Sequence, residues 1–204
     1  MRMSRDGGLN RRFFPATPAF AQKPGNGPVF CGRPATGVTA RVGAASDSAM
    51  PALALCQPDI PQNAGTLLRL GACLGVTVHM IEPAGFDASD RNLRRAGLDY
   101  LTHVDLRRHS SWDAFEQWRV AEGRRLVLLT TRAELPYVDF AFTREDILMV
   151  GRESAGVPGD VHAAADARLL IPMRAGLRSL NVAVAAAMVL GEALRQTGGL
   201  STTG

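Results

Sequence analysis

The chain lacks the glycine-rich signatures of the commonest nucleotide-binding sites. G-x-G-x-x-G follows none of its strand-like segments, and G-x-x-x-x-G-K-[S/T] does not occur. These absences exclude a dinucleotide-binding Rossmann domain and a P-loop, because both depend on those glycines to wrap backbone around phosphate. G-x-S-x-G is also absent, which argues against a serine hydrolase.

Cysteine is scarce. Cys31, Cys56 and Cys73 are the three cysteines, and no two of them form a C-x-x-C pair. Such spacing does not suit a disulfide framework or a zinc site, whereas it fits unpaired thiols in a reducing compartment. We therefore predict a cytoplasmic protein.

Metal-ligand patterns and long apolar runs are missing too. The four histidines are not spaced as ligand pairs, so we expect no bound metal. The apolar stretch from Phe13 to Ala21 is short and interrupted by proline. It suits neither a signal sequence nor a membrane span, and we expect no membrane association.

Positive charge is concentrated near the amino terminus. The formal net charge is +4 and the pI is near 9.5. Residues 1–49 carry a net charge of +5, which leaves −1 for residues 50–204. Because residues 1–49 also show no helical or strand periodicity, we expect a disordered tail, or a start assigned too early with translation beginning at Met50. Any polyanion site in the remaining domain must then be a local arginine cluster.

From Pro51 onward, apolar strand-like segments alternate with amphipathic helical segments. The expected strands are 52–56, 76–81, 101–106, 125–130, 147–150 and 169–171, and the expected helices are 63–74, 89–96, one capped by Ser110 or Ser111, and 182–195. This alternation predicts an α/β fold, a mostly parallel sheet with helices on both faces, and a ligand site at the carboxyl ends of the strands.

Two strand-to-loop transitions lie close together near the carboxyl terminus. The first reads Gly151-Arg-Glu-Ser-Ala-Gly-Val-Pro158, and the second runs from Leu170 to Asn181. Loops rich in glycine, proline and serine expose backbone amides and carbonyls that can bind a small molecule. The same glycines, Gly151 and Gly156, could equally be ordinary turn residues, and Glu153 could anchor a loop rather than take part in chemistry.

Three motifs in order resemble those of the SPOUT class of RNA methyltransferases. They are Pro58-Asp-Ile-Pro-Gln-Asn-Ala-Gly-Thr-Leu-Leu-Arg69, Gly151-Arg-Glu-Ser-Ala-Gly-Val-Pro158, and Ile171-Pro-Met173 with Ser179-Leu-Asn181. Arg94-Arg-Ala-Gly-Leu-Asp-Tyr100 further resembles the small family that methylates the 2′-hydroxyl of the wobble nucleotide of tRNA. The resemblance covers residues 50–204. It implies a SPOUT fold (alpha-beta knot) with a C-terminal trefoil knot, a homodimer, S-adenosyl-L-methionine as methyl donor and the tRNA anticodon stem-loop as partner.

The resemblance also implies positions for the cofactor site. It points to Leu129, Gly151, Ile171, Ser179 and Leu180. A flat apolar slot with backbone partners suits adenine, and Met173 could complete that slot. We further expect Glu153 and Gly156 to shape the cofactor site.

Arginines and polar residues at helix ends are the candidates for chemistry and RNA binding. Arg69 is our first catalytic candidate, because a guanidinium binds phosphate bidentately and stays charged. Asn63 could cap its helix, or hydrogen-bond substrate or a partner subunit. Ser179 and Asn181 begin the last helix, where exposed N–H groups can hold a carboxylate or a phosphate. The expected RNA contacts are Arg69, Arg94, Arg95, Arg152 and Arg178.

The last helix carries small residues on successive turns. Ala185, Ala186, Ala187 and Gly191 permit a close helix approach, which suits a dimer interface or burial within one subunit. Met188 to Gly191 departs from the aromatic or polar residues often found there in this family, so an RNA contact at that point is not expected.

Other functions remain open from the sequence. The enzyme could methylate another tRNA or rRNA position. The chain could also be a non-catalytic RNA-binding SPOUT module, although its intact loop residues argue against this. A nucleotide-dependent oxidoreductase is disfavoured, because G-x-G-x-x-G is missing.

Overall fold

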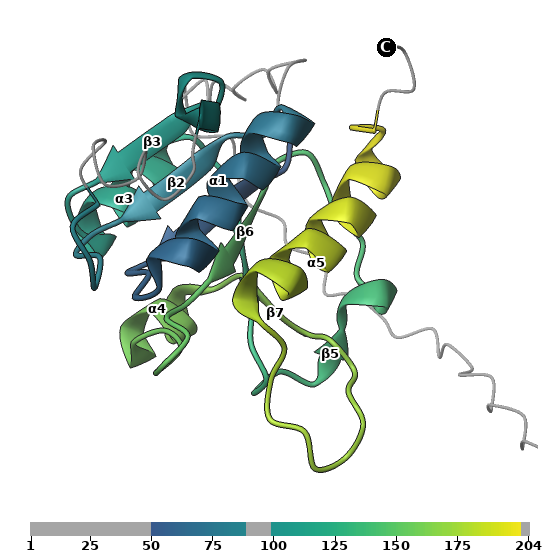
Figure 1. Ribbon diagram of the computed structural model, residues 1–204. Coiled ribbons are helices and arrows are strands. Elements are labelled where there is room, and N and C mark those ends of the chain that lie inside the picture. Colours follow the sequence, from purple (N-terminus) through teal and green to yellow (C-terminus); the bar gives the residue numbers. More distant parts are fainter. Residues whose placement is uncertain (1–49, 89–98, 201–204) are drawn as a thin grey trace, which may run out of the picture. The chain divides into compact units, whose positions relative to one another are not determined.

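Parallel strands form the centre of the computed structural model, which describes residues 50–88 and 99–200 (Figure 1). The strands are β1 Ala52–Cys56, β2 Val78–Ile81, β3 Leu106–His109, β4 Arg125–Leu129, β5 Leu135–Pro136, β6 Asp146–Val150 and β7 Ala167–Leu170. They form one sheet in the order β3-β2-β1-β6-β4-β7-β5, and every pairing is parallel. The predicted α/β class is confirmed, and the trefoil knot stays a prediction.

Helices cover both faces of this sheet. They are α1 Pro61–Leu74, α3 Trp112–Ala121, α4 Gly159–Ala164 and α5 Val182–Thr197, with 3-10 turns η1 Asp99–Thr102 and η2 Tyr137–Asp139. Leu53 and Leu55 of β1 belong to the core cluster that includes α1 and α5, which lie side by side in Figure 1. Ala54 of β1 belongs to the second cluster, with Phe115 of α3 and Val161 of α4. Alternate residues of a strand point to opposite faces, so the two helix pairs cover opposite sides.

The ends of the helices follow from local sequence. Pro61 occupies the first turn of α1, where its fixed φ and missing N–H are tolerated. The helix therefore starts two residues before the predicted Asn63. Gly75 ends it with φ +66°, a left-handed conformation that favours glycine. Ser111 caps α3 as predicted, because its hydroxyl accepts the N–H of Ala114 at 3.2 Å.

One predicted strand is wrong. The chain from Leu101 to Val104 forms the end of η1 and a turn, and the strand begins at Leu106. Both His103 and Val104 donate their N–H to the carbonyl of Tyr100. This turn lets Leu101 and Val104 pack against the core without the alternation of a strand. The predicted helix 89–96 and the expected tail 1–49 lie outside the described residues.

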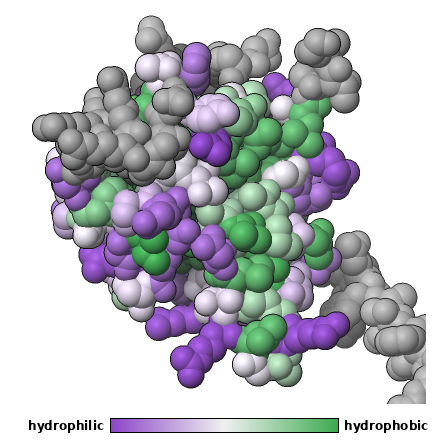
Figure 2. All heavy atoms as spheres, in the orientation of Figure 1, coloured by the Kyte–Doolittle hydropathy of each residue, from purple (hydrophilic) through white to green (hydrophobic). Residues whose placement is uncertain are grey.

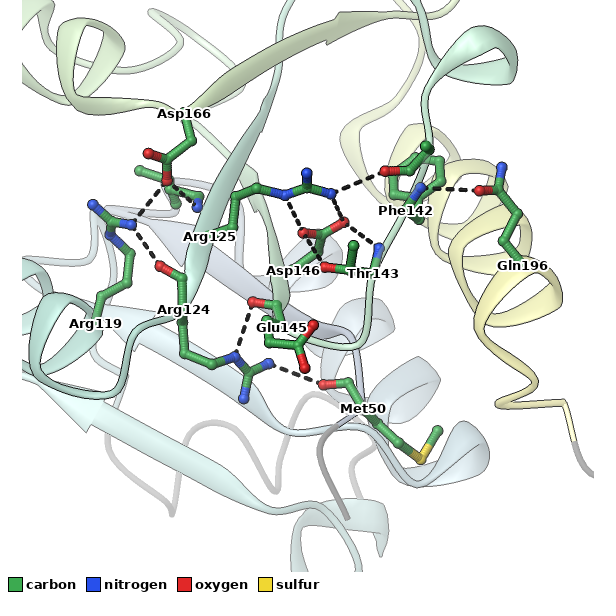
Figure 3. A network of polar contacts seen from close by, with 12 residues as sticks. Met50, Arg119, Arg124, Arg125, Phe142, Thr143, Glu145, Asp146, Asp166 and Gln196 are labelled. Carbon is green, nitrogen blue, oxygen red and sulfur yellow. Dashed lines mark hydrogen bonds and ion pairs between the residues drawn. The ribbon is translucent and has the colours of Figure 1, made fainter. Parts of the chain in front are cut away.

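A buried ion-pair network joins strands β4 and β6 at their amino ends (Figure 3). The Asp146 carboxylate is fully buried, and Arg125 donates to its two oxygens at 2.6 and 2.8 Å. The backbone N–H and the hydroxyl of Thr143 also donate to it. Arg124 donates to the carbonyls of Glu145 and Met50. This polar cluster therefore stabilises the sheet edge opposite the carboxyl ends of the strands.

Candidate active site

A cavity of about 460 Å³ lies at the carboxyl ends of β4, β6 and β7. Its walls come from the segments that follow these three strands and from the first turns of α1 and α5. A parallel sheet brings such loops to one edge, so segments far apart in sequence meet there. Every residue predicted for the cofactor site lines this cavity: Leu129, Gly151, Glu153, Gly156, Ile171, Met173, Ser179 and Leu180.

The loop of residues 151–158 is closed on itself by backbone hydrogen bonds. Arg152 and Gly156 exchange N–H···O bonds of 3.0 and 2.8 Å. Gly156 has φ +70°, which favours glycine. A Cβ on Gly151 would lie 2.5 Å from the carbonyl carbon of Gly156. Both glycines are thus required by the loop's own turn, and a further role in binding ligand stays a prediction.

Apolar side chains line one part of the cavity. Leu129 is the last residue of β4, Ile171 and Met173 follow β7, and Leu180 precedes α5. Together they give this part of the cavity an apolar lining. That it accepts an adenine ring stays a prediction. The sequence interpretation missed Ile60 and the pair Thr130 and Thr131, which also line the cavity. Their position directly after a strand or before a helix was the available signal.

Asparagines and a glutamate connect three segments at the polar part of the cavity. Asn181 donates its Nδ2–H to Asn63 Oδ1 at 3.0 Å, and Asn63 donates its Nδ2–H to Glu153 Oε1 at 2.8 Å. Asn181 also caps α5 by accepting the N–H of Ala183 at 2.9 Å. The proposed capping role of Asn63 is wrong, because Asn63 lies inside α1 and its side chain faces Glu153 and Asn181.

Asp59 is a residue of this network that the sequence interpretation missed. Its carboxylate accepts the N–H of Glu153 at 3.0 Å, the N–H of Ser154 at 3.3 Å and the Ser154 hydroxyl. A hydrogen bond with the Glu153 carboxyl, helped by those from Ser154, holds the pKa of Asp59 well below its usual range. Burial, and then the hydrogen bond with Asp59, raise the pKa of Glu153. The two carboxyls are therefore pushed in opposite directions.

Of the predicted arginines that the structure describes, only Arg152 lines the cavity. Arg152 lines it and donates to the Gln57 side chain. Arg178 is exposed on the loop between β7 and α5. Arg69 is not among the lining residues; it lies six residues beyond Asn63, about 9 Å along α1 at 1.5 Å per residue. Its guanidinium carbon lies 4.8 Å from the centre of the Tyr100 ring. Arg94 and Arg95 are outside the described residues.

Helix α5 presents an apolar strip to the surface. Val184, Ala187 and Met188 are exposed, while Ala186 is fully buried in the core. Ala186 therefore packs within its own subunit and is not available for the interface predicted from the small residues. Hydrophobic residues gather along α5 on the face shown in Figure 2.

Residues 50–88 and 99–200 contain neither a membrane-spanning helix nor a metal cluster. In this part of the chain, no helix is long and apolar enough to cross a membrane. Nor does it hold a cluster of three or more His, Cys, Asp or Glu side chains arranged to bind a metal ion.

A family model matches the greater part of this chain. The model described as "SpoU rRNA Methylase family" matches residues 50–191. The match covers all the segments that form the cavity, from the first turn of α1 to the start of α5.

Curated relatives are similar over nearly their whole length. A protein of Ancylobacter novellus named tRNA (cytidine(34)-2'-O)-methyltransferase is 63% identical over 153 residues, which cover 75% of this chain and 97% of the relative. A protein of the same name from Beijerinckia indica is 67% identical over 149 residues, covering 73% and 93%.

Solved structures agree in fold. One described as "Structural insights into the 2-OH methylation of C/U34 on tRNA" is 45% identical with a TM-score of 0.67, and the match covers 72% of this chain and 95% of that one. The SpoU methyltransferase AviRb from Streptomyces viridochromogenes, in complex with the cofactor AdoMet, is 27% identical with a TM-score of 0.67, covering 72% and 60%.

Proposed function

The chain belongs to the SpoU rRNA Methylase family, and we propose that it transfers the methyl group of S-adenosylmethionine to the ribose 2′-hydroxyl of nucleotide 34, the wobble nucleotide, in the tRNA anticodon loop. The observation that carries this proposal is the cavity at residues 129–131, 151–157 and 169–185, built from the segments that the family shares. The name of the two relatives at 63% and 67% identity supports position 34 as the target. We also place this reaction in the cytoplasm, which suits unpaired thiols.

The cavity fits the proposed methyl donor. Its volume of about 460 Å³ lies within the ~300–1,000 Å³ usual for cofactor sites. The apolar slot of Leu129, Ile171 and Leu180 suits an adenine ring, and the Asn63, Glu153 and Asn181 side chains supply polar partners nearby. When bound, S-adenosylmethionine supplies an electrophilic methyl group on a sulfonium.

The protein must orient a weak nucleophile. A ribose hydroxyl keeps its proton at neutral pH, so it must be held in line with the methyl group while that proton leaves. Asn63 and Asn181 are fixed by their mutual hydrogen bond at the polar side of the cavity. They can orient the ribose without rearranging, because the capping bonds of Asn181 already hold its side chain.

Arg69 binds the phosphate beside the target ribose in this proposal. Because Arg69 lies outside the lining of the cavity, we propose that the ribose sits between the cavity of one subunit and Arg69 of the partner subunit. The exposed apolar strip of Val184, Ala187 and Met188 on α5 supports a homodimer. Mixing Arg69→Ala and Gly151→Ala subunits tests this: a mixed dimer regains one intact site, and activity above that of either variant alone is expected. Absence of recovery in mixed dimers contradicts a shared site.

The function is tested with purified protein, S-adenosylmethionine carrying a labelled methyl group, and tRNA. Nucleotide-resolved mapping is expected to place the label on the ribose of nucleotide 34. A matched tRNA with 2′-deoxyribose at that nucleotide lacks the acceptor and should remain unlabelled. Label at another tRNA or rRNA position would keep the chemistry and overturn the substrate. A protein that neither labels RNA nor binds S-adenosylmethionine would be a non-catalytic RNA-binding module instead.

A further inference from the structure

The Asp59 and Glu153 side chains make a carboxyl pair beside the cavity. Asp59 follows β1, whereas Glu153 lies in the 151–158 loop, and Glu153 lines the cavity. Glu153 Oε1 accepts from Asn63 at 2.8 Å. Glu153 Oε2 is buried and has no donor among the described residues. A buried carboxylate oxygen without a donor is costly, so its state of protonation decides whether the arrangement is stable.

A proton on Glu153 completes the arrangement. Asp59 already accepts three hydrogen bonds from Glu153 and Ser154, which favours its charged form. A proton on Glu153 Oε2 would turn that buried oxygen into a donor facing the Asp59 side, and it would avoid two adjacent negative charges. The raised pKa of Glu153, caused by burial and then by Asp59, agrees with the proton lying on Glu153.

We propose that Asp59 is a positioning residue for the proposed methyl transfer: its carboxylate holds the acid form of Glu153 and the backbone of the 151–158 loop in the conformation that closes the cofactor cavity. The inference deepens the proposed function and rests on it for the identity of the ligand. Asp59 itself is not among the residues lining the cavity, so it acts through the loop.

The other polar groups around the pair have partners of their own. Asp59 is the charged group that acts on the Glu153 carboxyl. Asn63, from α1, is neutral and bonds the other carboxyl oxygen, and Asn181, from α5, bonds Asn63. Arg152, the neighbouring residue, donates to Gln57. Loss of the Glu153 proton, as pH rises through its raised pKa, leaves two carboxylates side by side and should open the loop.

Asp59→Asn is the first test. The Asn side chain can still accept one backbone N–H, but it has no negative charge to hold the proton of Glu153. We expect S-adenosylmethionine to bind about tenfold more weakly by titration calorimetry, because charge-assisted hydrogen bonds are lost. Asp160→Asn removes an exposed carboxylate from the same region and should bind as wild type. Equal binding by Asp59→Asn and wild type would overturn the proposal.

Glu153→Gln is the second test, because its amide can donate to Asp59 in place of the acid proton. Wild-type affinity for S-adenosylmethionine should fall as pH rises through the raised pKa of Glu153, whereas the affinity of Glu153→Gln, whatever its value at neutral pH, should lack this fall. Infrared spectroscopy at a pH below the raised pKa of Glu153 should show a protonated carboxyl band in wild type that disappears in Glu153→Gln. A pH dependence kept in the variant, or the absence of that band, contradicts the proposal.

These measurements separate the inference from the function. If wild type binds S-adenosylmethionine but labels no RNA, the proposed function fails while binding still tests Asp59. If wild type labels tRNA but Asp59→Asn binds and reacts like it, the inference alone fails. The infrared band tests the shared proton without any ligand.

Discussion

The guanidinium carbon of Arg69 lies 4.8 Å from the centre of the Tyr100 ring, so the arginine is held against the aromatic face of η1. A cation over an aromatic ring gains a modest attraction, which helps to hold the guanidinium in one position. Helix α1 thus carries two polar side chains that face different surroundings: Asn63 faces the cavity, and Arg69 faces Tyr100.

Arg69→Ala is expected to separate binding from transfer. The rate of methyl transfer to tRNA should fall about a hundredfold or more, because a charged group near the reacting ribose is lost. Affinity for S-adenosylmethionine should stay at the wild-type value, since Arg69 does not line the cavity. Single-turnover transfer and titration calorimetry measure the two quantities.

Tyr100→Phe and Tyr100→Leu form a matched pair for the same contact. Phe keeps an aromatic face under the guanidinium, whereas Leu removes it. The Phe variant should transfer faster than the Leu variant at saturating cofactor. A fully active Arg69→Ala enzyme would remove Arg69 from the mechanism, and equal rates for the two Tyr100 variants would remove the ring from its positioning.

Gly151→Ala is expected to weaken cofactor binding by about tenfold or more, because backbone must move. The added Cβ would meet the carbonyl carbon of Gly156 at 2.5 Å and its oxygen at 2.8 Å, and packed backbone cannot absorb such contacts without shifting. Titration with S-adenosylmethionine measures the loss. Gly159→Ala is the control, because its Cβ meets nothing within 4 Å. Wild-type affinity in Gly151→Ala would show that the loop adapts.

The sequence predicted which residues meet at the cavity better than it predicted where the arginines lie. Leu129 ends a strand of a parallel sheet, and Gly151 and Ile171 follow two others, so strand periodicity already brings them to one edge. Arg69 lies on a helix surface, where sequence spacing does not tell which neighbour it faces. The partner of Asp59 lies 94 residues away in sequence, and a contact of that kind depends on how the loops pack.

Short elements were missed for a different reason. Helix α4 has six residues and β5 has two, too few to show a helical or alternating period. The error at Leu101 arose because a short apolar run fits a buried strand and a buried turn equally well.

Arg125→Ala is expected to destabilise the fold without touching the cavity. It leaves the fully buried Asp146 carboxylate without its cation, and an unpaired buried charge costs about 3 kcal/mol. Thr143 still donates to Asp146, which limits the loss. Urea unfolding measures the change. Arg195→Ala breaks an exposed ion pair with Glu192 and should leave the midpoint unchanged; a comparable shift in both variants would contradict the buried network's role.

His79 is expected to make the fold sensitive to acid. Its side chain is buried, its Nδ1 atom lies 3.0 Å from His109 Nε2, and its ring packs on Trp118. Burial, with help from His109 and Arg107, lowers the pKa of His79 from 6.5 to about 3. At pH values between about 3 and 6.5, His79 is therefore protonated in the unfolded chain but not in the folded chain. The stability that neutral His79 contributes is fully present above about pH 6.5 and is lost as pH falls toward about 3.

His79→Asn measures this contribution directly. Wild type should lose about 2 kcal/mol of unfolding free energy from His79 between about pH 6.5 and about pH 5, because one pKa unit is worth about 1.4 kcal/mol. Asn keeps a polar atom near the position of Nδ1 but does not titrate, so the variant should lose less over the same range. His103→Asn, at an exposed histidine, should keep the wild-type slope. Urea unfolding at the two pH values decides: equal slopes for His79→Asn and wild type would show that another group carries the acid sensitivity.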